Sequence, residues 1–229
     1  MKKVISYLKP YTFGILFCLI FLIVQGFCEL SLPNYMSNIV NVGIQKNGIE
    51  NSAPEAMSEN FYSFFEIFMT DSEKNIFDKN YKLLRTDIKD NNYENYAKRY
   101  PLLEKENIYV CDNSDTNEIN STFDSVCLTM INFFKLYFPN YSISVSNSEH
   151  IDFSQIYNLK TQLQNLPKST FDDIKNSINS TNKDLAKQTS LYITKELYSE
   201  LGLDTDNFQK DYIFKTIKRE IQYNEFWAL

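Results

Sequence analysis

Few residues in this 229-residue sequence have the types and spacing that catalysis or metal binding requires. His150 is the only histidine, and it lacks the further histidine or cysteine ligands that a metal site needs. Residues 43–48 have glycines at the spacing of a phosphate-binding loop. Ile49 and Glu50 follow, however, where lysine and a hydroxyl residue must hold phosphate and magnesium. The sequence therefore predicts no catalytic, cofactor-binding or metal-ligating residues, and enzyme activity is not expected of this chain.

Gln25 and Glu29 are the polar residues whose spacing suggests a role in transport. They are four residues apart, so in a helix they lie one turn apart on the same face. An acidic residue at membrane depth usually faces a helix bundle or a water-filled cavity. Two interpretations stay open: the pair lines a translocation path, or Glu29 lies at the level of the lipid headgroups.

Two of the four cysteines form a possible disulfide bond. Cys111 and Cys127 lie in the polar part of the chain and would close a modest loop, which would contribute about 3 kcal/mol. Spacing alone does not decide pairing, so two thiols are the equal alternative. Cys18 and Cys28 fall in or at the edge of an apolar stretch and are interpreted as small apolar residues.

The element that positions Gln25 is an uncharged run over residues 11–28, whose only other clearly polar side chain is Thr12. Such a run is more favourable in hydrocarbon than in water. A helix of about 20 residues crosses a bilayer. We therefore predict that this segment spans a membrane.

The same helix is predicted to continue outward, so that it covers residues 12–48. Beyond the apolar run, polar residues recur at steps of three and four on one face, and mostly apolar residues lie roughly opposite. The polar residues are Ser31, Asn34, Asn38, Asn41 and Gln45, and the opposite ones are Leu32, Tyr35, Met36, Ile39 and Gly43. Pro33 is expected to kink the helix because its ring removes a backbone donor. A face for partner helices is unusual in a simple anchor.

The distribution of basic residues predicts the orientation of this helix. Lys2, Lys3 and Lys9 precede the apolar run, and the next basic residue is Lys46. By the positive-inside rule, the N-terminus is expected in the cytoplasm and the rest of the chain outside. Residues 1–11 are predicted to form a short amphipathic elbow helix on the cytoplasmic face. A cleaved signal peptide is the alternative, although the usual cleavage pattern of small residues is missing.

Residues 49–229 are polar in composition and predict a mostly helical extracytoplasmic domain. The fold class is therefore mainly α, with one long N-terminal transmembrane helix, a helical domain and at most a few short strands. Apolar spacing and caps predict helices over 54–70, 121–138, 152–166, 184–201 and 206–227, and a further helix that begins at residue 169. Strands are predicted over 107–111 and 141–145. Residues 72–85 fit either a short helix or a strand. The net charge of −6 and the scattered lysines argue against a nucleic-acid partner.

The N-terminal stretch resembles the start of the transmembrane domain of a bacterial ATP-binding cassette (ABC) exporter. The resembling residues are Leu-Lys-Pro-Tyr at 8–11 and Glu-Leu-Ser-Leu-Pro-Asn-Tyr-Met-Ser-Asn-Ile-Val-Asn-Val-Gly-Ile at 29–44. Gly-Ile-Glu at 48–50 and Ala-Pro-Glu-Ala at 53–56 resemble the opening of the enlarged extracytoplasmic insertion that some members carry between their first two membrane helices. The match covers roughly the first quarter of the chain.

This resemblance implies export of lipids, drugs or peptides, driven by ATP and magnesium at a nucleotide-binding domain. The sequence departs from the family where a second membrane helix should follow, because residues 215–229 are too charged to enter lipid. Helices two to six and the ATP-binding domain are missing. We therefore expect either a truncated half of an exporter permease, from a broken or partial reading frame, or a fragment that needs a partner chain, such as the remaining exporter helices or a second half-transporter. No transport is expected from this chain alone. The alternative is a membrane-anchored extracytoplasmic binding or sensor protein, which predicts a stable domain with its own concave pocket.

Overall fold

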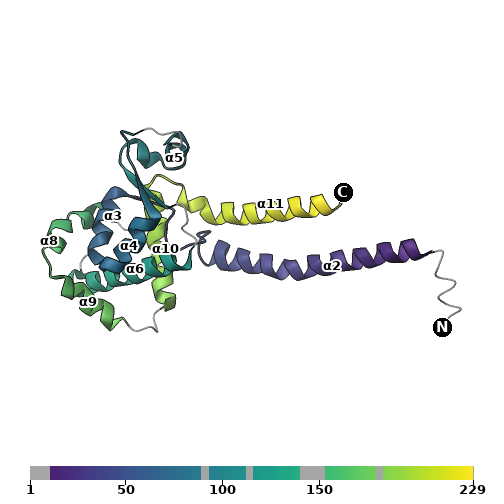
Figure 1. The fold of residues 1–229 in the computed structure, drawn as a ribbon, viewed down its shortest axis with the longest axis horizontal. Helices are drawn as coiled ribbons and strands as arrows, with labels where there is room; N and C mark the ends of the chain where they lie inside the picture. Colours follow the sequence, from purple (N-terminus) through teal and green to yellow (C-terminus); the bar gives the residue numbers. More distant parts are fainter. Residues whose placement is uncertain (1–10, 89–92, 112–115, 140–152, 179–182, 229) are drawn as a thin grey trace. The chain divides into compact units, whose positions relative to one another are not determined.

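The computed structural model describes residues 11–88, 93–111, 116–139, 153–178 and 183–228. It is mainly helical, with one long apolar helix near the N-terminus and a small sheet, which confirms the predicted fold class (Figure 1). The chain forms two compact units, a central unit of residues 49–208 and a terminal unit of residues 1–48 and 209–229. The division differs from the predicted domain 49–229, because the last helix belongs to the same unit as the first.

The terminal unit contains the predicted long helix. Helix α2 covers Thr12–Asn38 and continues as the π-helical turn η2 over Ile39–Ile44. This 33-residue helix is long and apolar enough to cross a membrane. Pro33 lies inside α2. The helix ends where Asn47 and Gly48 adopt positive φ angles of 51° and 80°, a conformation that asparagine and glycine tolerate best.

The π turn was not predicted from the sequence. In η2 the Gln45 amide donates to the carbonyl of Val40, five residues earlier, at 2.9 Å. A turn of this width is a single-turn bulge in an otherwise α-helical segment. The second helix of the terminal unit, α11, covers Phe208–Ala228, close to the predicted 206–227.

The central unit contains a three-stranded antiparallel sheet. Strand β3, Ile108–Cys111, lies between β1, Ala56–Ser58, and β2, Tyr81–Leu84. Its β-branched and aromatic residues gave the prediction for 107–111, which is confirmed. The predicted strand over 141–145 and His150 lie outside the described residues.

Ten short helices and turns surround this sheet in the described part of the central unit. They are α3 (Glu59–Phe65), η3 (Glu66–Phe68), α4 (Asp71–Asn80), α5 (Tyr93–Arg99), η4 (Pro101–Glu104), α6 (Asn117–Tyr137), α7 (Phe153–Tyr157), α8 (Lys160–Gln164), α9 (Lys168–Ser177) and α10 (Lys183–Glu200), and η7 (Thr205–Asn207) follows them. Helix α10 matches the prediction for 184–201, and Gly202 ends it with a φ of 87°. The ambiguous stretch 72–85 forms both α4 and β2.

Three predicted helix boundaries were wrong. The helix predicted over 54–70 starts only at Glu59, because Ser58 caps it and the preceding residues pair with β3. Helix α6 starts four residues before the predicted Ser121, because Thr116 accepts a hydrogen bond from the Ile119 amide and acts as the cap. The helix predicted over 152–166 is two short helices, α7 and α8.

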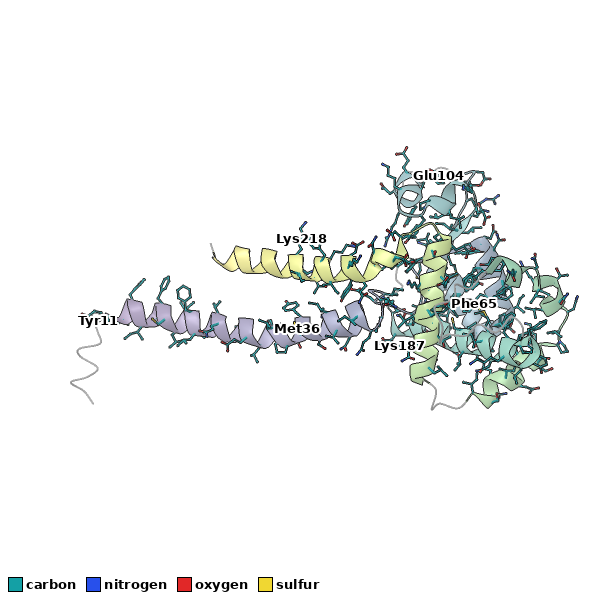
Figure 2. All side chains as sticks on the ribbon, turned by 180° about the vertical axis from the view of Figure 1, so that it is seen from behind. Tyr11, Met36, Phe65, Glu104, Lys187 and Lys218 are labelled. Carbon is teal, nitrogen blue, oxygen red and sulfur yellow. The ribbon has the colours of Figure 1, made fainter. Side chains whose placement is uncertain are left out.

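The core of the central unit consists largely of aromatic rings from α3, α4 and α6. Phe65 is fully buried, with ring centroids 5.1 Å from Phe61, 5.1 Å from Phe123 and 5.9 Å from Phe77. Figure 2 shows Phe65 among the helices of this unit. The pair with Phe61 is stacked, that with Phe123 is tilted and that with Phe77 is edge-to-face, and ring pairs at these distances stabilise a core beyond the effect of burial alone. The core thus belongs to residues 49–208 themselves.

Candidate functional site

The predicted polar pair in the long apolar helix lies as its spacing requires. Gln25 and Glu29 are one turn apart in α2, and the Gln25 amide Nε2 donates to Glu29 Oε1 at 2.9 Å. Both side chains are exposed. The amide therefore provides a hydrogen-bond donor for a carboxylate at the end of the apolar run, which lowers the cost of placing it near lipid. Their role in lining a translocation path stays a prediction.

The end of the helix formed by α2 and η2 makes a close contact with the beginning of α11. Gly43 is buried, and a Cβ atom placed on it would lie 2.9 Å from Ile213 Cγ1 and 3.4 Å from Tyr212 Cδ1. Any larger side chain would push against α11, so glycine permits this approach. The sequence placed Gly43 on the face opposite the polar residues, but it did not identify α11 as a partner.

The two helices run side by side in opposite chain directions, as Figures 1 and 2 both show. On α2 and η2, partly or fully buried residues recur every four positions, at Ser31, Tyr35, Ile39 and Gly43. On α11 the partly buried residues include Tyr212, Ile213 and Thr216. Spacings of three and four place each set on one helix face. Three of these residues, Tyr35, Ile39 and Gly43, were predicted on the face opposite the polar residues, whereas Ser31 was predicted on the polar face.

A second apolar row on the outward part of α2 and η2 is not covered within the described chain. Leu32, Met36, Val40 and Ile44 are spaced by four residues and are all exposed. The first two were predicted on the face opposite the polar residues. The spacing forms the i, i+4 ridge that helices use to pack against one another. This row is the surface of the terminal unit best suited to further helices.

In the central unit, Glu200 forms a hydrogen-bonded cluster that the sequence did not reveal. Ser58 Oγ donates to Glu200 Oε1 at 3.0 Å, and the Tyr157 hydroxyl donates to both carboxylate oxygens at 3.1 and 3.2 Å. Burial raises the pKa of the Glu200 carboxyl group, and the nearby carboxylate of Glu106 acts in the same direction. Burial also raises the pKa of the Tyr157 hydroxyl. The three residues are far apart in sequence, so no local motif could have identified them.

The cluster joins three elements, β1, α7 and α10. Ser58 is also the cap of α3, because its Oγ accepts a hydrogen bond from the Phe61 amide at 3.0 Å. The hydroxyl groups of Ser58 and Tyr157 donate to a carboxylate and so hold α7 and β1 to α10. Its chemistry is that of a structural link sensitive to protonation. Among the residues that the structure describes, no group of three histidine, cysteine or acidic side chains could hold a metal ion.

Two hollows in the described part of the central unit are small or strongly polar. One, of about 350 Å³, is open and lined by Glu59, Asn60, Thr86, Lys105, Glu106 and Asn107. A second, of about 160 Å³, lies between the start of α4 and α9. Ligand pockets of proteins are mostly apolar concavities of roughly 300–1,000 Å³ with few polar groups. Neither hollow has both the size and the lining of such a pocket.

The structure has no disulfide bond between Cys111 and Cys127. Both side chains are buried thiols, Cys111 in β3 and Cys127 in α6. Burial raises the pKa of the Cys127 thiol well above its usual value, which keeps it protonated and unreactive. These two residues contribute to the core of the central unit as small apolar groups.

Comparison of the chain with protein-family models, with curated proteins and with solved structures found no match.

Proposed function

We propose that this chain forms the first membrane helix and the extracytoplasmic insertion of an ABC exporter permease. In this proposal α2 crosses a bacterial cell membrane with its N-terminus in the cytoplasm, and residues 49–208 fold outside. Transport of a lipid, drug or peptide and ATP hydrolysis belong to the assembled exporter. This chain supplies part of the wall of the membrane domain and the outer domain above it.

The contact of Gly43 with Ile213 is the observation that carries this proposal. It brings the residues before and after the central unit together, so that the central unit is inserted between two helices that pack on each other. An anchor that merely tethers a domain needs one helix and no returning partner. A permease whose insertion follows its first helix needs the chain to return to that helix. The residues resembling the exporters, 29–44, include the α2 side of this contact.

The exposed row on α2 and η2 supports the same proposal. Leu32, Met36, Val40 and Ile44 lie at or beyond the end of the apolar run and are exposed in the chain alone. Leaving such a ridge in water costs about 25 cal/mol for each Å² of apolar surface. Neighbouring exporter helices would remove this cost.

The proposal is tested by purifying the tagged full chain from its native membranes in mild detergent after chemical cross-linking. We expect mass spectrometry to find an ABC subunit with a phosphate-binding loop among the cross-linked partners. Met36→Lys places a charge in the exposed row and is expected to reduce that recovery by about tenfold, the effect of roughly 1.4 kcal/mol. Leu136→Lys is the matched control, because Leu136 is exposed on the central unit and outside the row.

Two results contradict the proposal. One is recovery of the chain without any ATP-binding partner, and the other is equal loss of the partner in both variants. Recovery of the chain without an ATP-binding partner would favour the alternative function, a membrane-anchored binding or sensor protein. That second function has one observation in its favour, the polar hollow beside Glu59 and Glu106, which is large enough for a small hydrophilic molecule.

A further inference from the structure

The polar pair of α2 lies on the same helix face as the beginning of the exposed apolar row. An α-helix turns by about 100° per residue, so Gln25, Glu29, Leu32 and Met36 fall within about 60° of one another around the helix axis. All four side chains are exposed, and Met36 is labelled in Figure 2. A helix that covers the row therefore also covers the carboxylate of Glu29.

The side of α2 that is partly buried beside α11 is a different one. Ser31 and Tyr35 belong to the buried row that contains Gly43, and they lie about 120° or more away from Glu29 around the axis. Within the described chain, α11 thus leaves the carboxylate and the apolar row beside it open.

Covering this face removes water from a negative charge. Glu29 directly follows the uncharged run over residues 11–28, so it lies at the membrane surface if α2 spans. The Gln25 amide donates to Glu29 Oε1 at 2.9 Å, which satisfies one hydrogen-bond site but does not neutralise the charge. A charge that loses its water is tolerated where an opposite charge pairs with it and further hydrogen bonds complete the pair.

The two helices of the terminal unit provide no such opposite charge at this level. No basic residue occurs between Lys9 and Lys46, and none follows Arg219 in α11. At a rise of about 1.5 Å per residue, Arg219 lies about 9 Å along α11 from the contact with Gly43, and Glu29 lies about 21 Å along α2 from it. The two residues are therefore about 12 Å apart in height. A countercharge must come from another helix.

We propose that the helix that covers the exposed row carries a lysine or arginine at the level of Glu29, and that Glu29 pairs with it. This inference rests on the proposed function, because it assumes that a neighbouring membrane helix covers the row. It adds the chemistry of that partner, which is an apolar helix surface with one basic residue near the outer end of its span. Long basic side chains reach the membrane surface from such positions. Gln25 positions the carboxylate for the pair.

The test uses the tagged full chain, cross-linked and purified from its native membranes, and measures the recovery of the ATP-binding subunit. Glu29→Lys sets two positive charges against each other, so we expect recovery to fall about tenfold. Glu29→Gln removes the attraction without adding repulsion and should lower recovery only about threefold. Leu30→Lys is the matched control, because residue 30 is exposed at nearly the same height but points about 100° away. Its recovery should equal that of the unaltered chain.

An exchange of charges tests the pair itself. Once the partner is recovered, its basic residue at this depth is changed to glutamate. Alone, this change should lower recovery as Glu29→Lys does, and together the two changes should restore most of it, because the pair is re-formed with its charges exchanged. Retention in membranes after an alkaline carbonate wash checks that each variant is still inserted.

Four outcomes overturn the inference: full recovery with Glu29→Lys, equal loss with Glu29→Gln and Glu29→Lys, equal loss with Leu30→Lys, or a partner without a basic residue at this depth. Glu29 would then face lipid headgroups or water. If Met36→Lys still loses the partner in these cases, the proposed function stands and only the pair is wrong. If the unaltered chain recovers no ATP-binding subunit, the proposed function itself fails.

Discussion

Burial of the Glu200 carboxyl group makes the stability of the central unit depend on pH. The pKa of this group is raised in the folded chain, chiefly by desolvation. As the pH rises, the Glu200 carboxyl group therefore loses its proton at a lower pH in the unfolded chain than in the folded chain. Stability is highest when the carboxyl is protonated, falls as the pH rises from the usual glutamate value, and levels off above the raised value.

Glu200→Gln is expected to flatten that pH dependence. Glutamine imitates the protonated carboxyl group and can still accept hydrogen bonds from Ser58 and Tyr157. Urea unfolding of the full chain, followed by circular dichroism between pH 4 and pH 8 as an approximate range around the usual glutamate pKa, measures the effect. Glu104→Gln is the control, because Glu104 is exposed in η4. An unchanged slope in Glu200→Gln would rule out Glu200 as its source.

Phe65→Ala is expected to destabilise the central unit by about 3–5 kcal/mol, the usual cost of a large core cavity. The ring is fully buried between Phe61, Phe77 and Phe123, so its loss removes contacts on several sides. Leu136→Ala is the matched control, because Leu136 is exposed and should change stability by less than about 0.5 kcal/mol. Equal urea midpoints for both variants would contradict this description of the core.

At the residue scale, local patterns predicted only some of the candidate site. The spacing of Gln25 and Glu29 placed them on one helix face because four residues make about one turn. Ser58, Tyr157 and Glu200 come from β1, α7 and α10, and only the tertiary fold brings them together. For Cys111 and Cys127 the spacing left two alternatives open.

At the scale of elements, the contact between η2 and α11 yields a direct prediction. In a chain whose four native cysteines are replaced, Gly43→Cys with Ile213→Cys should form a disulfide bond under mild oxidation. The close approach at Gly43 brings the two Cβ atoms near the separation of about 3.5–4.5 Å that a disulfide needs. Gly26→Cys with Ile213→Cys is the control, because nothing lies within 4 Å of a Cβ at Gly26. Equal cross-linking in both pairs would contradict the contact.

Long, periodic elements were predicted well, and their boundaries were not. The apolar run, α10 and β3 follow from composition and spacing over several residues. The start of α3 depends on β1 pairing with β3, which is a tertiary contact. The π turn at Ile39–Ile44 lies where α11 approaches, since η2 contains Gly43, against which Ile213 packs. Single-sequence patterns contain neither contact.

At the scale of the whole molecule, the central unit is expected to fold by itself. Its aromatic core, its sheet and the Glu200 cluster all come from residues 49–208. A protein of these residues alone should unfold cooperatively in urea, with coincident transitions by circular dichroism and by tyrosine fluorescence. Gradual, non-coincident loss of signal would mean that the central unit needs the terminal unit for stability.

The sequence predicted a mainly α chain with one membrane-length helix, and it grouped the last helix with the outer domain. Residues 208–228 have charged and apolar residues mixed along them, so their composition gave a further helix of the outer domain. The structure instead groups them with α2, because Ile213 and Tyr212 pack at Gly43.

The most direct measurement concerns the membrane. The full chain is expressed in bacteria, the membrane fraction is washed with alkaline carbonate, and the intact mass of the chain that stays in the membrane is measured. In a parallel sample, protease is applied to whole spheroplasts. We predict that the chain stays in the membrane with its first thirty or so residues uncleaved, as about 20 apolar residues suffice to span, and that protease reaches residues 49–208 from outside. A soluble product that has lost its N-terminal helix would contradict the proposed function.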